Sequence, residues 1–202
     1  MQEQLSAPRE KVWNIRADIQ QPDREKVERL QETLGLSSVV STLLALRGYD
    51  SPNSASDFLY LKTEMLCDPF AMMDMEKGVL RISQALEKGE KIVIYGDYDV
   101  DGVTAVCTLY LYLKSKGANI EYYIPNRMGE GYGVTVAAVD RLADEGATLI
   151  ITVDTGITAA EEVAHAATRG VDFVVTDHHE CRSDLPRACA VINPHRPDDT
   201  YP

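Results

Sequence analysis

The spacing of hydrophobic and polar residues divides the chain into a helical first part and a second part in which strands and helices alternate. In residues 23–35, Val27, Leu30 and Leu34 recur at spacings of three and four, which predicts an amphipathic helix that ends at Gly35. Three further helices are predicted in this part: residues 39–48, a short helix that begins at Pro52, and residues 74–89, capped by Asp74 and ended by Gly89.

From Lys91 onward, short runs rich in β-branched residues alternate with helical segments of roughly a dozen residues. This alternation predicts a mostly parallel sheet, and strands that are apolar nearly throughout indicate that helices cover both of its faces. We therefore expect an α/β fold with a Rossmann-like, doubly wound sheet in residues 76–202, preceded by a helical region in residues 1–75. The predicted strands are residues 91–97, 119–125, 148–154, 171–177 and 189–193, and the helices between them are residues 102–117, 135–146 and 158–170.

Composition and charge exclude several classes of protein. The formal net charge of −12 argues against broad nonspecific binding of nucleic acid, which usually needs a basic face, although bound metal ions would neutralise part of this acidity. No apolar run is long enough to span a bilayer, and the polar residues 1–10 lack the core of a secretory signal, so we expect a cytoplasmic protein without membrane contact. The four cysteines form no CxxC pair and are expected to be reduced, with Cys107 in the core.

Acidic residues and histidines follow three of the predicted strands. In an open parallel sheet, ligands bind beyond the carboxyl ends of the strands, so side chains at these ends are expected to meet at one edge. The first strand is followed by Asp97, Asp99 and Asp101, the third by Asp154, and the fourth by Asp177, His178 and His179.

Carboxylates gathered at this density repel one another unless a cation lies between them. Oxygen-rich ligands with one or two imidazoles suit Mn²⁺ or Mg²⁺, whereas a Zn²⁺ site of the thiolate type would need cysteine ligands. Two such ions could clamp a phosphate and convert a water into a hydroxide nucleophile, so the residues predict metal-dependent hydrolysis of phosphoesters. Gly102 and Gly156 are expected to let the backbone turn sharply after the ligands.

Each part of this constellation also has an ordinary structural explanation. Asp154 alone could be the N-cap of the following helix, and the Asp97–Asp101 turn could be a solvated loop or a weak Ca²⁺ site. The two histidines could be exposed side chains without a functional role, or His178, His179 and Cys181 could form a zinc site. Only their convergence at one sheet edge distinguishes a metal site from these alternatives.

Three short motifs resemble those of a known family. GDYDVDG at residues 96–102, VDTGI at 153–157 and TDHHE at 176–180 occur in the order of the first three motifs of the DHH phosphoesterase superfamily. The similarity is most specific to the RecJ family of single-strand-specific exonucleases and covers most of the chain from about Arg47. Further segments that resemble RecJ proteins are residues 47–59, the DPF segment at 68–70, and residues 122–133 and 185–202.

The resemblance implies a role for each matching residue. In this superfamily, aspartates of the first motif bind two metal ions, the aspartate of the second motif bridges them, and the first histidine of the third motif is also a ligand. The matching metal ligands are Asp97, Asp99, Asp101, Asp154 and His178, and the implied catalytic residues are Asp101, Asp154, His178 and His179, with His179 contacting the scissile phosphate. Asp177 is expected to orient the imidazoles. Arg127 is a candidate contact to a DNA phosphate, with a loop salt bridge as the alternative.

The resemblance also implies a reaction and a context. It implies degradation of single-stranded DNA from the 5′ end to mononucleotides by two-metal hydrolysis with Mn²⁺ or Mg²⁺, in DNA repair and recombination, with single-strand-binding protein and a helicase as expected partners. Hydrolysis of small phosphoesters (oligoribonucleotides, cyclic dinucleotides or pyrophosphate) and a noncatalytic scaffold remain as alternatives. A further acidic ligand, a second clamping domain and an OB-fold of the family have no match, so we expect an N-terminal fragment with little nuclease activity of its own.

Overall fold

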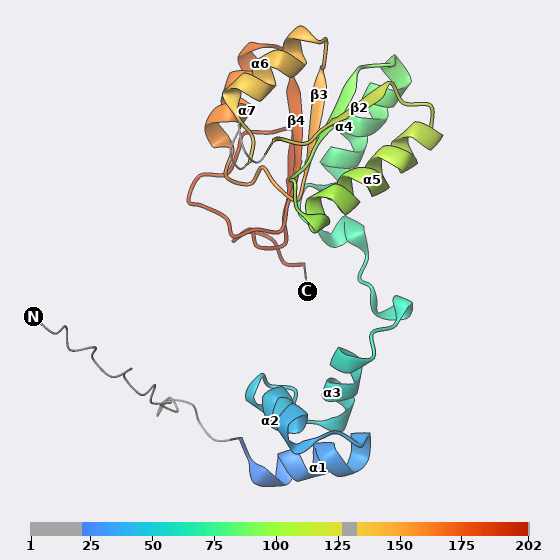
Figure 1. The fold of residues 1–202 in the computed structure, drawn as a ribbon, viewed down its shortest axis with the longest axis vertical. Helices are drawn as coiled ribbons and strands as arrows, with labels where there is room; N and C mark the ends of the chain where they lie inside the picture. The colour runs from blue at the N-terminus through green and yellow to red at the C-terminus, as the bar shows by residue number, and fades with distance from the viewer. Residues whose placement is uncertain (1–21, 127–132, 202) are drawn as a thin grey trace, which may run out of the picture. The chain divides into compact units, whose positions relative to one another are not determined.

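The structure, a computed structural model, describes residues 22–126 and 133–201. The chain divides into two compact units between Leu66 and Cys67. Figure 1 shows helices α1, α2 and α3 in the first unit, and the sheet with its flanking helices in the second. The domain boundary that we expect at residue 75 stays a prediction.

The three α-helices of the first unit begin where a side-chain oxygen accepts a backbone N–H that the helix itself cannot pair. Asp23, Ser37 and Ser51 are these caps, and Ser51 forms a reciprocal capping box with Ser54. The first helix ends at Gly35 in the left-handed conformation, as predicted. The elements are α1 (Arg24–Leu34), α2 (Ser38–Leu46), α3 (Pro52–Leu59) and the 3₁₀ turn η1 (Thr63–Met65), and one buried residue from each α-helix forms the core: Leu30, Leu44 and Ala55.

The second unit contains a five-stranded sheet in the order β2-β1-β3-β4-β5, and every neighbouring pair of strands is parallel. This confirms the predicted α/β class and the parallel sheet. The elements in chain order are η2 (Pro69–Ala71), α4 (Met75–Lys88), β1 (Ile92–Tyr95), α5 (Val100–Ser115), β2 (Ile120–Tyr123), α6 (Val136–Asp144), β3 (Leu149–Val153), α7 (Ala160–Thr168), β4 (Asp172–Thr176) and β5 (Ala190–Ile192).

Helices cover both faces of the sheet, with α6 and α7 on one side and α4 and α5 on the other (Figure 1). Alternate residues of each central strand therefore enter two different cores: Val93 and Ile150 pack with α6 and α7, whereas Ile92 and Ile151 pack with α4. Connections leave β1 and β3 toward opposite edges of the sheet, so the crevice of a doubly wound fold lies at the carboxyl ends of these two strands.

Two local predictions are wrong. Asp74 occupies the N-cap position of α4 but makes no side-chain cap, because its backbone is left-handed (φ 61°) and its carboxylate pairs with Lys77 and Arg196 instead. Cys107 is exposed, since it lies on the face of α5 that points away from the sheet, and apolar residues around the whole helix hid this in the sequence. All four cysteines are free. No helix in the described ranges is both long enough and apolar enough to cross a membrane.

Candidate metal centre

The turn after β1 presents Asp97 and Asp99 at the sheet edge. Asp97 is buried, with 3% of its surface exposed, and its Oδ1 accepts the backbone N–H of Tyr98 at 2.7 Å. Asp99 is the N-cap of α5, because its Oδ1 accepts the N–H of Gly102 at 2.9 Å. The start of this 16-residue helix places backbone N–H groups and the positive end of the helix dipole beside the two carboxylates.

Gly102 has a different role from the turn that we expect from the sequence. It lies in the first turn of α5, and a Cβ at this position would come within 2.6–2.8 Å of backbone atoms of Asp97. The absence of a side chain lets the helix approach the end of β1 closely, which brings Asp99 and Asp101 next to Asp97.

Asp154 follows β3 in a left-handed conformation (φ 58°) that aspartate adopts more readily than most residues. The turn continues through Gly156 (φ 106°), where a Cβ would lie 2.6 Å from Thr152 Oγ1, so the expected turn is confirmed. Only 5% of the Asp154 side chain is exposed. Its Oδ1 lies 2.8 Å from His178 Nε2, and its buried Oδ2 has no hydrogen-bond partner among the described residues.

Asp177, at the end of β4, organises the two histidines that follow it. Its Oδ1 accepts the backbone N–H groups of His178 and His179 and contacts the Nδ1 of His179 at 2.7 Å. Its Oδ2 accepts the N–H of Ile157 from the turn after β3 at 2.9 Å. Asp177 therefore orients the ring of His179 as expected, but it reaches His178 only through the backbone.

The side chains converge on two groups of potential ligands that share Asp154. Asp97, Asp99 and Asp154 offer oxygen atoms that all lie within 4.8 Å of one another, and Asp154, His178 and His179 form a second such group. Asp101 belongs to neither group, although its Oδ2 lies 3.7 Å from His178 Nε2 and its side chain is 70% exposed. Arg127 lies outside the described residues.

Among the residues that the structure describes, carboxylates outnumber the histidines at this site. Burial raises the pKa of Asp154, and the negative charges of Asp101 and Asp99 add to this, although the hydrogen bond from His178 opposes it. The hydrogen bond to Asp177 raises the pKa of His179, against the opposing effect of burial. For both groups, the charges of neighbouring carboxylates also contribute to the rise of the pKa.

The residues fit divalent cations better than they fit the ordinary structural explanations. The Oδ2 of Asp154 is a buried oxygen without a hydrogen-bond partner in residues 22–126 and 133–201, and a cation would satisfy it; the surrounding donors are mainly carboxylates. Asp154 is not an N-cap, since Ala159 holds that position in α7, and it is Asp99 that caps a helix. Cys181 packs against the hydrophobic core instead of joining His178 and His179, which argues against a zinc site.

The sequence did not reveal that apolar side chains share this pocket. Met72, Ala105, Ile192 and Pro194 line the same open cavity of about 390 Å³ as Asp101, Asp154 and His178. Their positions along the chain are far apart, and each reads as an ordinary helix, strand or loop residue. Only the resemblance of the DPF segment and the C-terminal residues to RecJ proteins pointed to these regions.

Comparisons with known proteins show which family this chain resembles. The model of the "DHH family, N-terminal domain" matches residues 91–200. The single-stranded-DNA-specific exonuclease RecJ of Bacillus subtilis (strain 168) is 44% identical over 188 residues, which is 93% of this chain and 24% of that protein. The chain thus spans about a quarter of the length of this relative.

Two solved structures are similar to this chain in fold. A crystal structure of exonuclease RecJ bound to manganese aligns with a TM-score of 0.62 and 32% identity, over 67% of this chain and 35% of that chain. The RecJ of Thermus thermophilus in complex with Mn²⁺ aligns with a TM-score of 0.63 and 25% identity, over 90% of this chain and 25% of that chain. With the motifs, the parallel sheet and the family model in agreement, the chain belongs to the DHH family, and its resemblance to the RecJ exonucleases is confirmed.

Proposed function

We propose that this chain carries the metal-binding half of a nuclease site that hydrolyses single-stranded DNA from its 5′ end and releases 5′-mononucleotides. The observation that carries the proposal is that two ligand groups share Asp154, which suits two divalent ions held side by side. RecJ relatives that are named single-strand-specific exonucleases, and RecJ structures that contain Mn²⁺, support the substrate and the metal.

Divalent ions in such a site supply Lewis-acid activation of the phosphate and of a water molecule. In this proposal, Asp97 and Asp99 would hold one ion, His178 would be a ligand of the other, and Asp154 would be a ligand of both. Mn²⁺ or Mg²⁺ fits these ligands because carboxylate oxygens predominate. Asp101, exposed beside His178, completes the ligand set or positions water.

The protein groups around the ligands have separate tasks. Asp177 holds the His179 ring through Nδ1, which leaves Nε2 to contact the scissile phosphate. Asp177 also ties the turn after β3 to the turn after β4 through Ile157, so the ligands from both strands keep their spacing. Arg127 is the proposed contact to a further DNA phosphate.

The decisive experiment measures nuclease activity of the full-length protein with Mn²⁺ or Mg²⁺ on a 5′-phosphorylated single strand. Asp101→Ala and His178→Ala are each expected to lower the turnover number at least a hundredfold, because each removes a group that acts on the reacting phosphate or its metals. Glu87→Gln, an exposed carboxylate on α4, is the matched control and should keep full activity. Undiminished activity in both site variants would refute the proposal.

The substrate class needs its own comparison. A RecJ-type enzyme should turn over a long single strand much faster than a dinucleotide or pyrophosphate, and the reverse order would favour a small-molecule phosphodiesterase of the same family. A noncatalytic scaffold would bind no Mn²⁺ in a calorimetric titration. Residues 1–202 alone are expected to bind metal with little exonuclease activity. A role in DNA repair, with single-strand-binding protein and a helicase as partners, belongs to the same proposal.

A further inference from the structure

The pocket that contains the metal ligands is also lined by apolar side chains. The charged residues of its lining are Asp101, Asp154, Asp177 and His178, and four of its apolar residues are Met72, Ala105, Ile192 and Pro194, which we call the apolar wall. Small-ligand sites are lined by apolar side chains together with polar groups that orient the ligand, and this cavity has both. Both kinds of residue line one cavity, so a ligand held by the carboxylates lies next to the wall.

The wall is assembled from three distant segments of the second unit. Met72 comes from residues 67–74, which we call the strap, and Ala105 comes from α5. Ile192 ends β5 and is buried, whereas Pro194 in the loop that follows is exposed and Met72 is half-buried. Half-exposed apolar side chains beside charged ligands leave apolar surface available to a bound molecule.

A buried ion pair fixes the strap against the loop after β5. Arg196 Nη1 donates to Asp74 Oδ2 and to the carbonyl of Val191, each at 2.7 Å, and only 9% of the Arg196 side chain and 12% of the Asp74 side chain are exposed. A pair so far removed from solvent holds its geometry much better than a surface ion pair. The strap and Pro194 are therefore placed by the fold.

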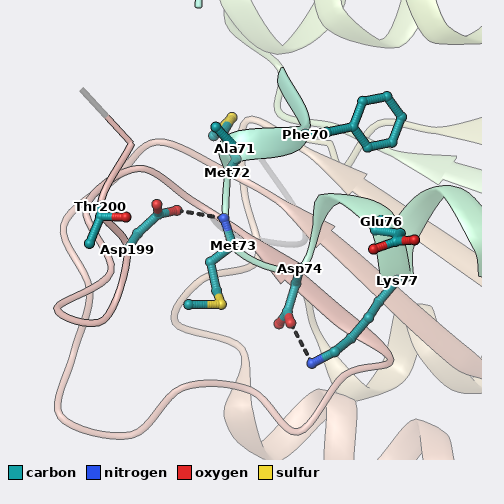
Figure 2. A pocket seen from close by; sticks show the side chains of 9 residues that line it. All are labelled: Phe70, Ala71, Met72, Met73, Asp74, Glu76, Lys77, Asp199 and Thr200. Carbon is teal, nitrogen blue, oxygen red and sulfur yellow. Dashed lines mark hydrogen bonds and ion pairs between the residues drawn. The ribbon is translucent and has the colours of Figure 1, made fainter. Parts of the chain in front are cut away.

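A second contact holds the strap at Met73. Its backbone N–H donates to Asp199 Oδ2 at 3.0 Å, across a neighbouring pocket of about 290 Å³ that Figure 2 shows. In this view the side chains of Met72 and Met73 leave the strap in different directions. Met72 lines the cavity of the metal ligands, but Met73 does not, which makes Met73 a natural control.

We propose that the apolar wall holds the deoxyribose and base of the nucleotide whose phosphate lies at the metal ligands, and that Asp74 and Arg196 are its positioning residues. This inference rests on the proposed function. A nucleoside is joined covalently to its phosphate, so it must lie within one nucleotide of the ligands, where the wall offers apolar surface. Wall side chains cannot hydrogen-bond to base edges, which suits an enzyme that must accept every base in turn.

The test compares the binding of two probes to the Mn²⁺-saturated chain by calorimetry: thymidine 5′-monophosphate and inorganic phosphate. Met72→Ala is expected to weaken binding of the nucleotide about five- to tenfold, because it removes apolar contact, and to leave binding of phosphate and of Mn²⁺ unchanged. Met73→Ala should leave all three unchanged. Equal affinity of the wild-type chain for both probes, or no effect of Met72→Ala on the nucleotide, overturns the inference.

The same titrations separate this inference from the proposed function. A chain that binds neither Mn²⁺ nor phosphate overturns the metal site and the wall with it. A chain that binds both, but in which Met72→Ala matches Met73→Ala, overturns the wall alone.

The positioning role of Arg196 is tested by a double-mutant cycle. Arg196→Gln should weaken nucleotide binding as much as Met72→Ala does, with phosphate binding unchanged, and the double variant should lose no more than either single variant, because the wall is already displaced. Arg196→Lys retains a cation for Asp74 and should therefore show a smaller loss of nucleotide affinity than Arg196→Gln. It replaces Arg196→Gln in the test if that variant folds poorly. Additive losses, or equal weakening of phosphate binding, would overturn the positioning role.

Discussion

Replacement of Asp154 by Asn should separate two effects on the stability of the fold: the destabilisation by charge repulsion without metal, and the stabilisation by bound metal. Asparagine has the same shape and tolerates the left-handed backbone at this position, so the turn after β3 is retained. Without metal, the buried carboxylate lies close to Asp99 and Asp101, and its Oδ2 has no partner among the described residues. The neutral amide removes this repulsion, so the metal-free variant should be at least as stable as the wild type.

With metal, the order of stabilities should reverse. At a Mn²⁺ concentration 100 times the dissociation constant, one bound ion stabilises the wild-type chain by about 2.7 kcal/mol. For a chain of this size, that corresponds to a rise of the melting temperature by about 5–11 °C. Asp154 belongs to both ligand groups, so the variant should lose most of this rise and gain less than about 2 °C at the same concentration.

The assay is thermal unfolding followed by circular dichroism, with and without Mn²⁺, for the wild type and two variants. Glu87→Gln makes the same change of charge on the exposed side of α4 and should follow the wild type in both conditions. An equal Mn²⁺-induced rise in Asp154→Asn and the wild type would refute the placement of Asp154 between two ions. A metal-free variant that melts well below the metal-free wild type would refute the account of charge repulsion.

Two further predictions concern the frame around the site. Gly102→Ala should lower the free energy of unfolding by about 1–3 kcal/mol in urea titrations and weaken Mn²⁺ binding, because the new methyl group collides with the backbone of Asp97; unchanged stability would contradict the close approach. Burial alone would raise the pKa of Asp74, but hydrogen bonds from Lys77 and Arg196 outweigh it and lower the pKa. The ionised carboxylate therefore stabilises the fold above the unfolded pKa of about 3.9, and this contribution disappears as the pH falls through the folded pKa. The Asp74→Asn variant should consequently lose less stability than the wild type between pH 5 and pH 2. Identical pH profiles of stability would contradict this prediction.

Much of the fold was readable from local patterns. Residues 149–153 are apolar except for Thr152, a pattern that occurs when helices cover both faces of a parallel strand, and the structure places β3 at the centre of the sheet. Gly35 and Pro52 marked helix ends correctly, because these signals involve atoms only a few residues apart. The carboxylates at the strand ends were predictable for a similar reason: the ends of parallel strands meet at one edge.

Properties that depend on packing between distant segments could not be read in this way. Asp99 rather than Asp154 caps a helix, and Gly102 is needed for its contact with the backbone of Asp97, which depends on how closely α5 approaches β1. Cys107 is exposed because it lies on the side of α5 that faces away from the sheet. The sequence did not show which side this is, because apolar residues occur on several sides of the helix.

The apolar wall and its ion pair are the clearest case of a feature that the sequence could not specify in advance. Asp74 and Arg196 are 122 positions apart. The sequence predicts Asp74 as a helix cap, whereas in the structure the loop after β5 places the guanidinium of Arg196 beside it. Sequence patterns report interactions between residues a few positions apart, since these share one turn or one strand. Contacts between side chains that are far apart in the sequence depend on how whole helices and loops pack onto the sheet, so they become visible only in the tertiary structure.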